Sequence, residues 1–262
     1  MSARTIALVH GAWMNPESWE PWADRLRRRG YDVITPAWPF DDRPVAALRA
    51  SPAPELAAVG VGEIVAHYEA ILRALPRPPI LIGHSFGGLF TQLLLGRGVG
   101  ACGVAIDPAP IKGVFPAPNA VRAAFFVAST WGASKKVFHM SFEDFRWGWV
   151  HTLPEEEQRR VYERYVVPTP GRPYIEGLAA PFTGLFDAHP KDRTAPLLLI
   201  AGEEDRTVTA SMVRAAHGIQ KRSAARTDLR TFPGRTHWIC GQPGWEEVCD
   251  AAIGWAEEVL PA

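Results

Sequence analysis

The feature that most constrains this chain is a short apolar run that ends in a glycine-rich turn and continues as a helix. Residues 80–82 are apolar throughout, residues 83–88 read Gly-His-Ser-Phe-Gly-Gly, and residues 89–97 carry a helical pattern. Glycines two residues before and two residues after Ser85 let the chain turn sharply between a buried strand and a helix. This G-x-S-x-G pattern in that context predicts a turn that exposes the serine hydroxyl.

Short apolar runs alternate with helical patterns along most of the chain. Such alternation predicts an α/β protein with a mostly parallel sheet of about six strands, flanked by helices. Residues 40–55 are rich in Pro and Asp, and we expect a loop there. The expected strands cover residues 5–9, 31–36, 80–82, 102–106, 196–200 and 229–232, and the expected helices cover residues 15–29, 59–75, 89–97, 210–219 and 244–260.

The alternation lapses in the middle of the chain. Residues 111–190 hold no apolar strand run, but they are dense in Phe, Trp and Tyr, and three acids after Pro154 resemble the first turn of a helix. We therefore expect a mostly helical insertion over residues 111–190. The core domain is then formed by residues 1–110 and 191–262.

Charge and cysteine content narrow the classes of partner. Lys plus Arg is 28 and Asp plus Glu is 28, so the formal net charge is zero, and we expect neither nucleic acid nor an anionic membrane as a partner. No apolar run approaches the roughly 18 residues of a membrane span. The N-terminal residues lack a signal peptide's cleavage region, which predicts a cytoplasmic protein. Cys102, Cys240 and Cys249 lack metal-ligand spacing and are expected to be reduced, a Cys240–Cys249 bridge being the less expected alternative.

A serine hydroxyl becomes a good nucleophile only when a histidine, oriented by a carboxylate, takes its proton. Reactive groups of an open parallel sheet gather at the carboxyl ends of its strands, so we searched for such residues directly after expected strands. Asp205 and His237 both meet this condition, which gives the chain order Ser85, Asp205, His237. Asp107 also ends a strand and is the alternative to Asp205 as the acid.

The same reaction needs donors for the negative charge that develops on the carbonyl oxygen. Backbone amides serve best because they are fixed before the charge appears. One expected donor is the amide of Phe86, directly after the nucleophile. The second is expected from the loop after the first strand, at Ala12, with Trp13 as the alternative.

The remaining histidines are expected to be structural. His10 is expected to hold the loop after the first strand, and His84 to fill the turn around Ser85. The others form no metal-ligand spacing such as HExxH, so no metal is expected. These others are His67, His139, His151, His189 and His217.

Together these residues resemble the α/β-hydrolase superfamily over nearly the whole chain. The matching elements are His10-Gly11, the turn at residues 83–88, residues 202–208 and His237. The chain is similar to the serine esterase, lipase and acyl-hydrolase branch, which implies a helical cap over residues 111–190, a pocket lined by aromatic side chains, and no cofactor. We expect Trp13, Trp147 and Trp238 to line that pocket.

The chain departs from the family pattern in two places and differs from some branches at the site. Thr236 stands where the family often has glycine, and the usual first two antiparallel strands are missing. Dehalogenases and epoxide hydrolases of this fold use aspartate where Ser85 stands. Some hydroxynitrile lyases carry lysine where Trp238 follows His237. Both of these activities are therefore disfavoured.

The expected function is a serine hydrolase that cleaves a small carboxylic ester, lactone or thioester through an acyl-enzyme. The dense aromatics favour an apolar or aromatic substrate. A monomer or a homodimer is expected. The alternatives are a ligand receptor that retains a slow triad, a cofactor-free perhydrolase or haloperoxidase, and a biosynthetic thioesterase or cyclase.

Overall fold

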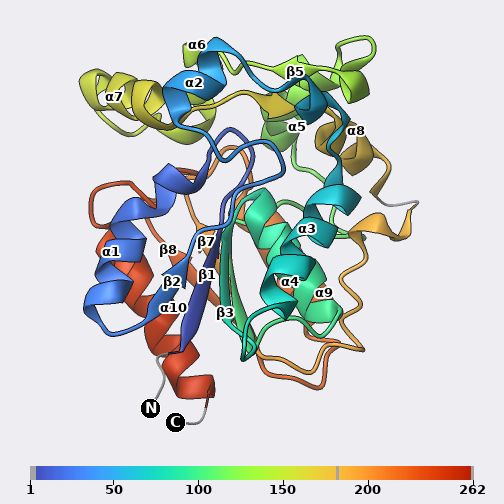
Figure 1. Cartoon of the computed structure of the whole chain (residues 1–262), viewed down its shortest axis with the longest axis vertical. Coiled ribbons are helices and arrows are strands. Elements are labelled where there is room, and N and C mark those ends of the chain that lie inside the picture. The colour runs from blue at the N-terminus through green and yellow to red at the C-terminus, as the bar shows by residue number, and fades with distance from the viewer. Residues whose placement is uncertain (1–3, 181–182, 261–262) are drawn as a thin grey trace.

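The computed structural model describes residues 4–180 and 183–260. Within these ranges, six strands form one sheet in the order β2-β1-β3-β4-β7-β8, and every neighbouring pair in it is parallel (Figure 1). The predicted α/β class with a parallel sheet of about six strands is confirmed. The strands are β1 (Thr5–Val9), β2 (Asp32–Ile34), β3 (Ile80–His84), β4 (Cys102–Ile106), β7 (Leu197–Gly202) and β8 (Thr227–Phe232).

The central strands are apolar on both faces because helices cover both sides of the sheet. In β1, Ala7 and Val9 pack on one face, while Ile6 and Leu8 pack on the other. The first face is covered by α3 (Val61–Arg73), α4 (Phe86–Gly96) and α9 (Ala210–Gln220), and the second by α1 (Glu20–Arg28) and α10 (Trp245–Val259) (Figure 1). A strand buried on both faces loses the polar alternation of a half-exposed strand.

The residues between β4 and β7 form a layer of short helices above the carboxyl ends of the sheet (Figure 1). A two-stranded antiparallel ribbon, β5 (Val137–Phe138) with β6 (Thr169–Pro170), joins two of its segments. Ser141 caps the N-terminus of α6 (Phe142–Trp149) by accepting a hydrogen bond from the Asp144 amide. The helices are α5 (Pro118–Ala128), α6 (Phe142–Trp149), α7 (Glu155–Tyr165) and α8 (Arg172–Leu178).

The loop expected over residues 40–55 is wrong for residues 45–50 and 54–55, whereas residues 40–44 and 51–53 are irregular. The chain forms α2 (Val45–Ala50) and a 3-10 helix (Pro54–Ala58) there. Val45 and Leu48 of α2 bury their side chains against Val167. Burial of these side chains outweighs the local preference of Pro and Asp for loops, a contribution that sequence pattern alone does not show.

The three cysteines and the lengths of the helices bear on two further predictions. Cys102, Cys240 and Cys249 are all buried and free, so the Cys240–Cys249 bridge is not formed. Among the described residues, no helix combines the length and the apolar character that crossing a membrane requires.

Candidate active site

Ser85 lies in a strained turn between β3 and α4. Its backbone has φ 58° and ψ −121°, a left-handed conformation that is rare for any residue with a side chain. The turn is held because the Ser85 amide donates to the Ile106 carbonyl at 3.0 Å, while the Ser85 carbonyl accepts from the Ala109 amide at 2.9 Å. A Cβ atom on Gly11 would lie 2.7 Å from the Ser85 Cβ, so the neighbouring loop also needs glycine for this close approach.

The structure brings His237 and Asp205 to this turn from the ends of β8 and β7. The His237 Nε2 lies 3.1 Å from the Ser85 Oγ, and the His237 Nδ1 lies 2.5 Å from the Asp205 Oδ2. The other carboxylate oxygen of Asp205 accepts hydrogen bonds from the amides of Thr207 at 2.6 Å and Val208 at 2.8 Å. The imidazole is therefore bound on both nitrogens, and its carboxylate partner is itself fixed.

Burial sets the protonation of these groups. Loss of water lowers the pKa of His237 to about 3, so the imidazole is neutral at pH 7 and able to accept a proton. Burial also raises the pKa of Asp205 well above its usual value, but hydrogen bonds from the Val208 and Thr207 amides act in the opposite direction. Because these donors favour the charged form, we assign Asp205 as the carboxylate.

Asp107, the alternative acid, lies beside Asp205 and not on the imidazole. Its Oδ1 accepts a hydrogen bond from the Gly202 amide at 2.7 Å, and its side chain is fully buried. Burial and the charge of Asp205 raise the pKa of Asp107 well above its usual value. Burial therefore disfavours a second carboxylate beside Asp205, and the contact with the His237 Nδ1 assigns Asp205 as the acid of the triad.

His84 packs against the imidazole of His237, with ring centroids 4.7 Å apart. Burial, and then the nearby His237, lowers the pKa of His84 well below its usual value. Ligand atoms of His84, Asp107 and His237 lie within 4.8 Å of one another, a spacing that suits a metal ion. Both nitrogens of His237 already have partners in Ser85 and Asp205, so His237 belongs to the hydrogen-bonded triad, whereas the His84 Nε2 and the Asp107 Oδ2 lack partners among the described residues.

The backbone amides expected to bind the developing anion differ in their partners. The Trp13 amide donates to the Thr169 Oγ1 at 2.7 Å and is therefore occupied. Among the described residues, no hydrogen-bond acceptor contacts the Ala12 amide. Phe86 is the first residue of α4, where an amide has no partner within the helix. His10 supports this loop, because its Nε2 accepts from the Trp38 amide at 3.2 Å.

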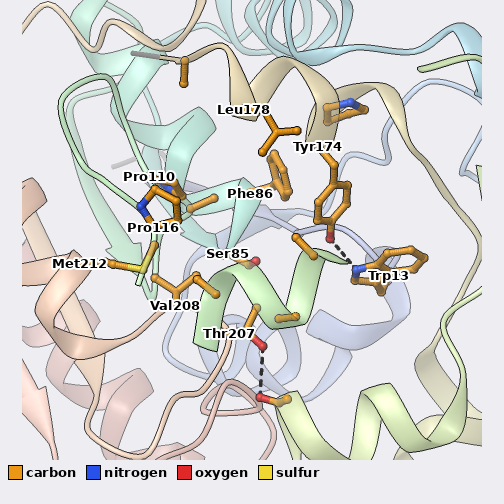
Figure 2. A pocket seen from close by; sticks show the side chains of 18 of the residues that line it. Trp13, Ser85, Phe86, Pro110, Pro116, Tyr174, Leu178, Thr207, Val208 and Met212 are labelled. Carbon is orange, nitrogen blue, oxygen red and sulfur yellow. Dashed lines mark hydrogen bonds between the residues drawn. The ribbon is translucent and has the colours of Figure 1, made fainter. Parts of the chain in front are cut away.

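Ser85 opens into a largely apolar cavity between the sheet and the helical layer (Figure 2). The cavity volume is about 190 Å³, which exceeds the roughly 150 Å³ of an engineered cavity known to bind benzene, so an aromatic ring fits. The Trp13 Nε1 donates to the Tyr174 hydroxyl at 2.5 Å across one side of the cavity. Other labelled lining residues are Phe86, Pro110, Pro116, Leu178, Thr207, Val208 and Met212.

Of the three tryptophans expected in the pocket, Trp13 alone is among the described residues that line this cavity. Trp147 lines a neighbouring polar pocket, and Trp238 packs against Tyr165 with ring centroids 5.3 Å apart. Adjacency to His237 in the chain does not place the Trp238 side chain beside the nucleophile. Tyr174 was missed because only the folding of α8 onto the loop after β1 brings it to the cavity.

The fold and this geometry define the class of protein to which the chain belongs. The model of the alpha/beta hydrolase family matches residues 6–251. The chain is a member of that family. No curated protein sequence matches it significantly.

Solved structures with the same fold are enzymes of several kinds. A monoacylglycerol lipase of Paleococcus ferrophilus is 19% identical with a TM-score of 0.68, over 97% of this chain and 95% of the lipase. A pyrethroid hydrolase of Sphingobium faniae is 17% identical with a TM-score of 0.69, over 97% and 98%. A structure from a study of Nitrososphaera gargenis carboxylesterases is 16% identical with a TM-score of 0.69, over 98% and 91%. At such low identity, the likeness shows the fold alone.

Proposed function

We propose that this protein is a serine hydrolase that cleaves small carboxylic esters, or related lactones and thioesters, through an acyl-enzyme. The observation that carries the proposal is the continuous line of contacts from Ser85 through His237 to Asp205 in a member of the alpha/beta hydrolase family. The lipase, the pyrethroid hydrolase and the carboxylesterases that share the fold support the same reaction class.

In the first half of the reaction, the Ser85 Oγ attacks the carbonyl carbon of the ester, and its proton passes to the His237 Nε2. The carbonyl oxygen becomes an oxyanion that accepts hydrogen bonds from the Ala12 and Phe86 amides. When the tetrahedral intermediate collapses, the bond to the leaving oxygen breaks. The leaving alcohol takes the proton from Nε2, and the acyl group stays on Oγ.

In the second half, water takes the place of the alcohol. His237 accepts a proton from the water as the water oxygen attacks the acyl carbon, and then returns that proton to Oγ as the acid is released. Asp205 holds the imidazole with Nδ1–H towards itself and stabilises the transient positive charge. The apolar cavity beside Ser85 favours an apolar or aromatic group on the substrate. Residues 111–190 are proposed to act as a cap that encloses it.

Hydrolysis of p-nitrophenyl acetate and p-nitrophenyl butyrate tests the proposal. The wild-type protein should turn over at least one of them repeatedly, and Ser85→Ala should lose about 10⁴-fold or more of that activity. Mass spectrometry should find the acyl group on Ser85 when the reaction is quenched. Full activity in Ser85→Ala would contradict the mechanism. Labelling of Ser85 by a fluorophosphonate without ester turnover would favour a receptor that retains the triad.

A further inference from the structure

A second pocket adjoins the cavity and differs from it in chemistry. It lies between α5, α6, α7 and the segment after Asp205, and it shares Ala123 and Asp144 with the apolar cavity. The two pockets therefore adjoin each other at these two residues. Most of its lining is polar, namely Arg122, Glu143, Asp144, Arg146, Trp147, His151, Gln158 and Arg206.

Two of the three arginines in this pocket have no acidic partner within the described ranges. The guanidinium carbon of Arg122 lies 4.0 Å from the centroid of the Trp147 ring, and that of Arg206 lies 5.8 Å from it. Arg146, in contrast, pairs with Glu143 at 3.0 Å. The remaining acid, Asp144, accepts a hydrogen bond from the Ser141 hydroxyl at 2.6 Å. Glu143 is therefore paired, Asp144 keeps its charge, and Arg122 and Arg206 are the guanidinium groups of this lining that have no acidic partner among the described residues.

Buried polar atoms in the same pocket also lack partners among the described residues. Both ring nitrogens of His151 and the Oε1 of Gln158 make no hydrogen bond there. Gln158 is only 6% exposed, and its amide nitrogen is held by the Leu153 carbonyl at 2.8 Å. A buried polar atom without a partner costs about 1–3 kcal/mol, so the unpaired nitrogens of His151 point to a hydrogen-bonding ligand, whereas the Gln158 Oε1 is an acceptor and gains no hydrogen bond from an anion.

His151 is neutral at pH 7 and so offers one N–H donor and one acceptor nitrogen. Burial and then the charge of Arg206 lower its pKa, and Glu204 opposes them as the smallest of the three causes. Two guanidinium groups, one imidazole N–H and a flat indole suit a planar anion such as a carboxylate.

We propose that Arg122, Arg206 and His151 form a cationic subsite that binds a carboxylate carried by the ester substrate while the apolar part of that substrate fills the cavity at Ser85. The inference rests on the proposed function, because it names the substrate class of the same site. It makes the preferred substrate an amphiphilic ester with a carboxylate at one end, and not a neutral ester.

Direct binding tests the subsite without any turnover. Ser85→Ala is titrated by calorimetry with 4-phenylbutyrate and with its neutral amide, 4-phenylbutanamide. The carboxylate should bind about 10- to 100-fold more tightly, as expected for charge-assisted hydrogen bonds. Adding Arg122→Gln and Arg206→Gln should abolish that preference. Adding Arg159→Gln and Arg160→Gln instead, which removes the same charge from α7, should preserve it.

Equal binding of the acid and the amide to Ser85→Ala would overturn the proposal. So would a preference for the acid that survives the loss of Arg122 and Arg206. Gln158→Glu provides a second variant should the double variant not fold: the added carboxylate should repel the ligand and weaken binding of 4-phenylbutyrate about tenfold or more. Unchanged binding in Gln158→Glu would contradict the subsite.

Steady-state kinetics test whether the same two arginines bind a carboxylate on a substrate that is hydrolysed. With the glutarate hemiester of p-nitrophenol, the Arg122→Gln, Arg206→Gln variant should raise KM about 10- to 100-fold, while kcat/KM for neutral p-nitrophenyl butyrate should stay within about twofold. An equal loss on both esters would overturn the assignment of a carboxylate. If the wild-type protein hydrolyses neither ester, the proposed function fails, and the calorimetry still decides on the subsite.

Discussion

The parallel sheet and the helical layer above it differ in how their functional side chains are held: those of the sheet are buried and hydrogen-bonded, and several of those in the layer are exposed or unpaired. At the strand ends, Asp205 and His237 each have fixed hydrogen-bond partners and fully buried side chains. In the helical layer, Arg122 lacks an acidic partner among the described residues, and Trp131 is 94% exposed. The sheet therefore holds its polar groups in fixed geometry, whereas the layer above it leaves polar and aromatic side chains exposed, in keeping with the proposed role of the layer in substrate choice.

The largest expected difference between the two regions is in activity. His237→Ala should lower kcat/KM about 10⁴-fold or more, because within the described part of the chain His237 is the base that contacts the Ser85 hydroxyl. His139→Ala, an exposed histidine between the ribbon strand β5 and α6, should change it less than about twofold. Initial rates on p-nitrophenyl butyrate measure both. A residual activity above one tenth in His237→Ala would place the base elsewhere.

Replacing a glycine with alanine should lower kcat when the glycine lies beside Ser85, and should leave kcat unchanged when the glycine lies in open space. Gly11→Ala should cost about 10²–10³ in kcat, because its Cβ would lie 2.7 Å from the Ser85 Cβ and 2.9 Å from the His84 carbonyl oxygen, displacing the loop that carries the Ala12 amide. Gly184 lies in the 3-10 helix that follows α8 in the chain, where an added Cβ meets no atom within 4 Å. Gly184→Ala should therefore leave kcat unchanged. Steady-state kinetics compare the two variants. Normal kcat in Gly11→Ala would show that the loop tolerates the displacement.

Truncating a large apolar side chain to alanine should cost more stability in the sheet than in the helical layer. Leu199→Ala, in the centre of β7 and fully buried, should lower the free energy of unfolding by about 3 kcal/mol through the cavity that it leaves. Trp131→Ala should change it by less than about 0.5 kcal/mol, because the ring is almost fully exposed. Urea denaturation gives both values. A similar cost for the two variants would mean that Trp131 is covered in solution.

The smallest expected effect is the pH dependence of stability from His10. Burial lowers the pKa of His10 to about 4, below the 6.5 of an exposed histidine, so the unfolded chain binds the proton first as pH falls. Stability is therefore present above pH 6.5 and is lost towards pH 4. His10→Gln should reduce the fall in unfolding free energy between pH 7 and pH 4.5 by about 2 kcal/mol. Urea titrations at both pH values, with His139→Gln as control, test the sign.

The sheet was predictable because its strands are buried on both faces and leave continuous apolar runs in the chain. The G-x-S-x-G turn predicted Ser85, and the rule that reactive groups follow such strands selected Asp205 and His237; the structure brings the three within contact distance. It did not by itself decide between Asp205 and Asp107, because both follow strands. That choice required the distance between the Asp205 Oδ2 and the His237 Nδ1.

The helical layer was less predictable because its contacts join distant segments. The composition of residues 111–190 predicted aromatic helices, but it did not show that Tyr174 faces the cavity while Trp238 turns towards Tyr165. The helix α2 was missed for the same reason, since Val45 and Leu48 are buried by a residue more than a hundred positions away. Long-range packing of this kind leaves no periodic signal.

The loop after β1 has consequences for exchanging parts between related enzymes. Trp13 of this loop is tied into the helical layer three times: its amide to Thr169, its indole to Tyr174, and its carbonyl to the Val167 amide at 2.9 Å. Replacing the helical layer with that of another hydrolase would remove all three hydrogen bonds to Trp13, the residue after Ala12. Chimaeras built to alter substrate range must therefore carry residues 167–174 and Trp13 as one inseparable module.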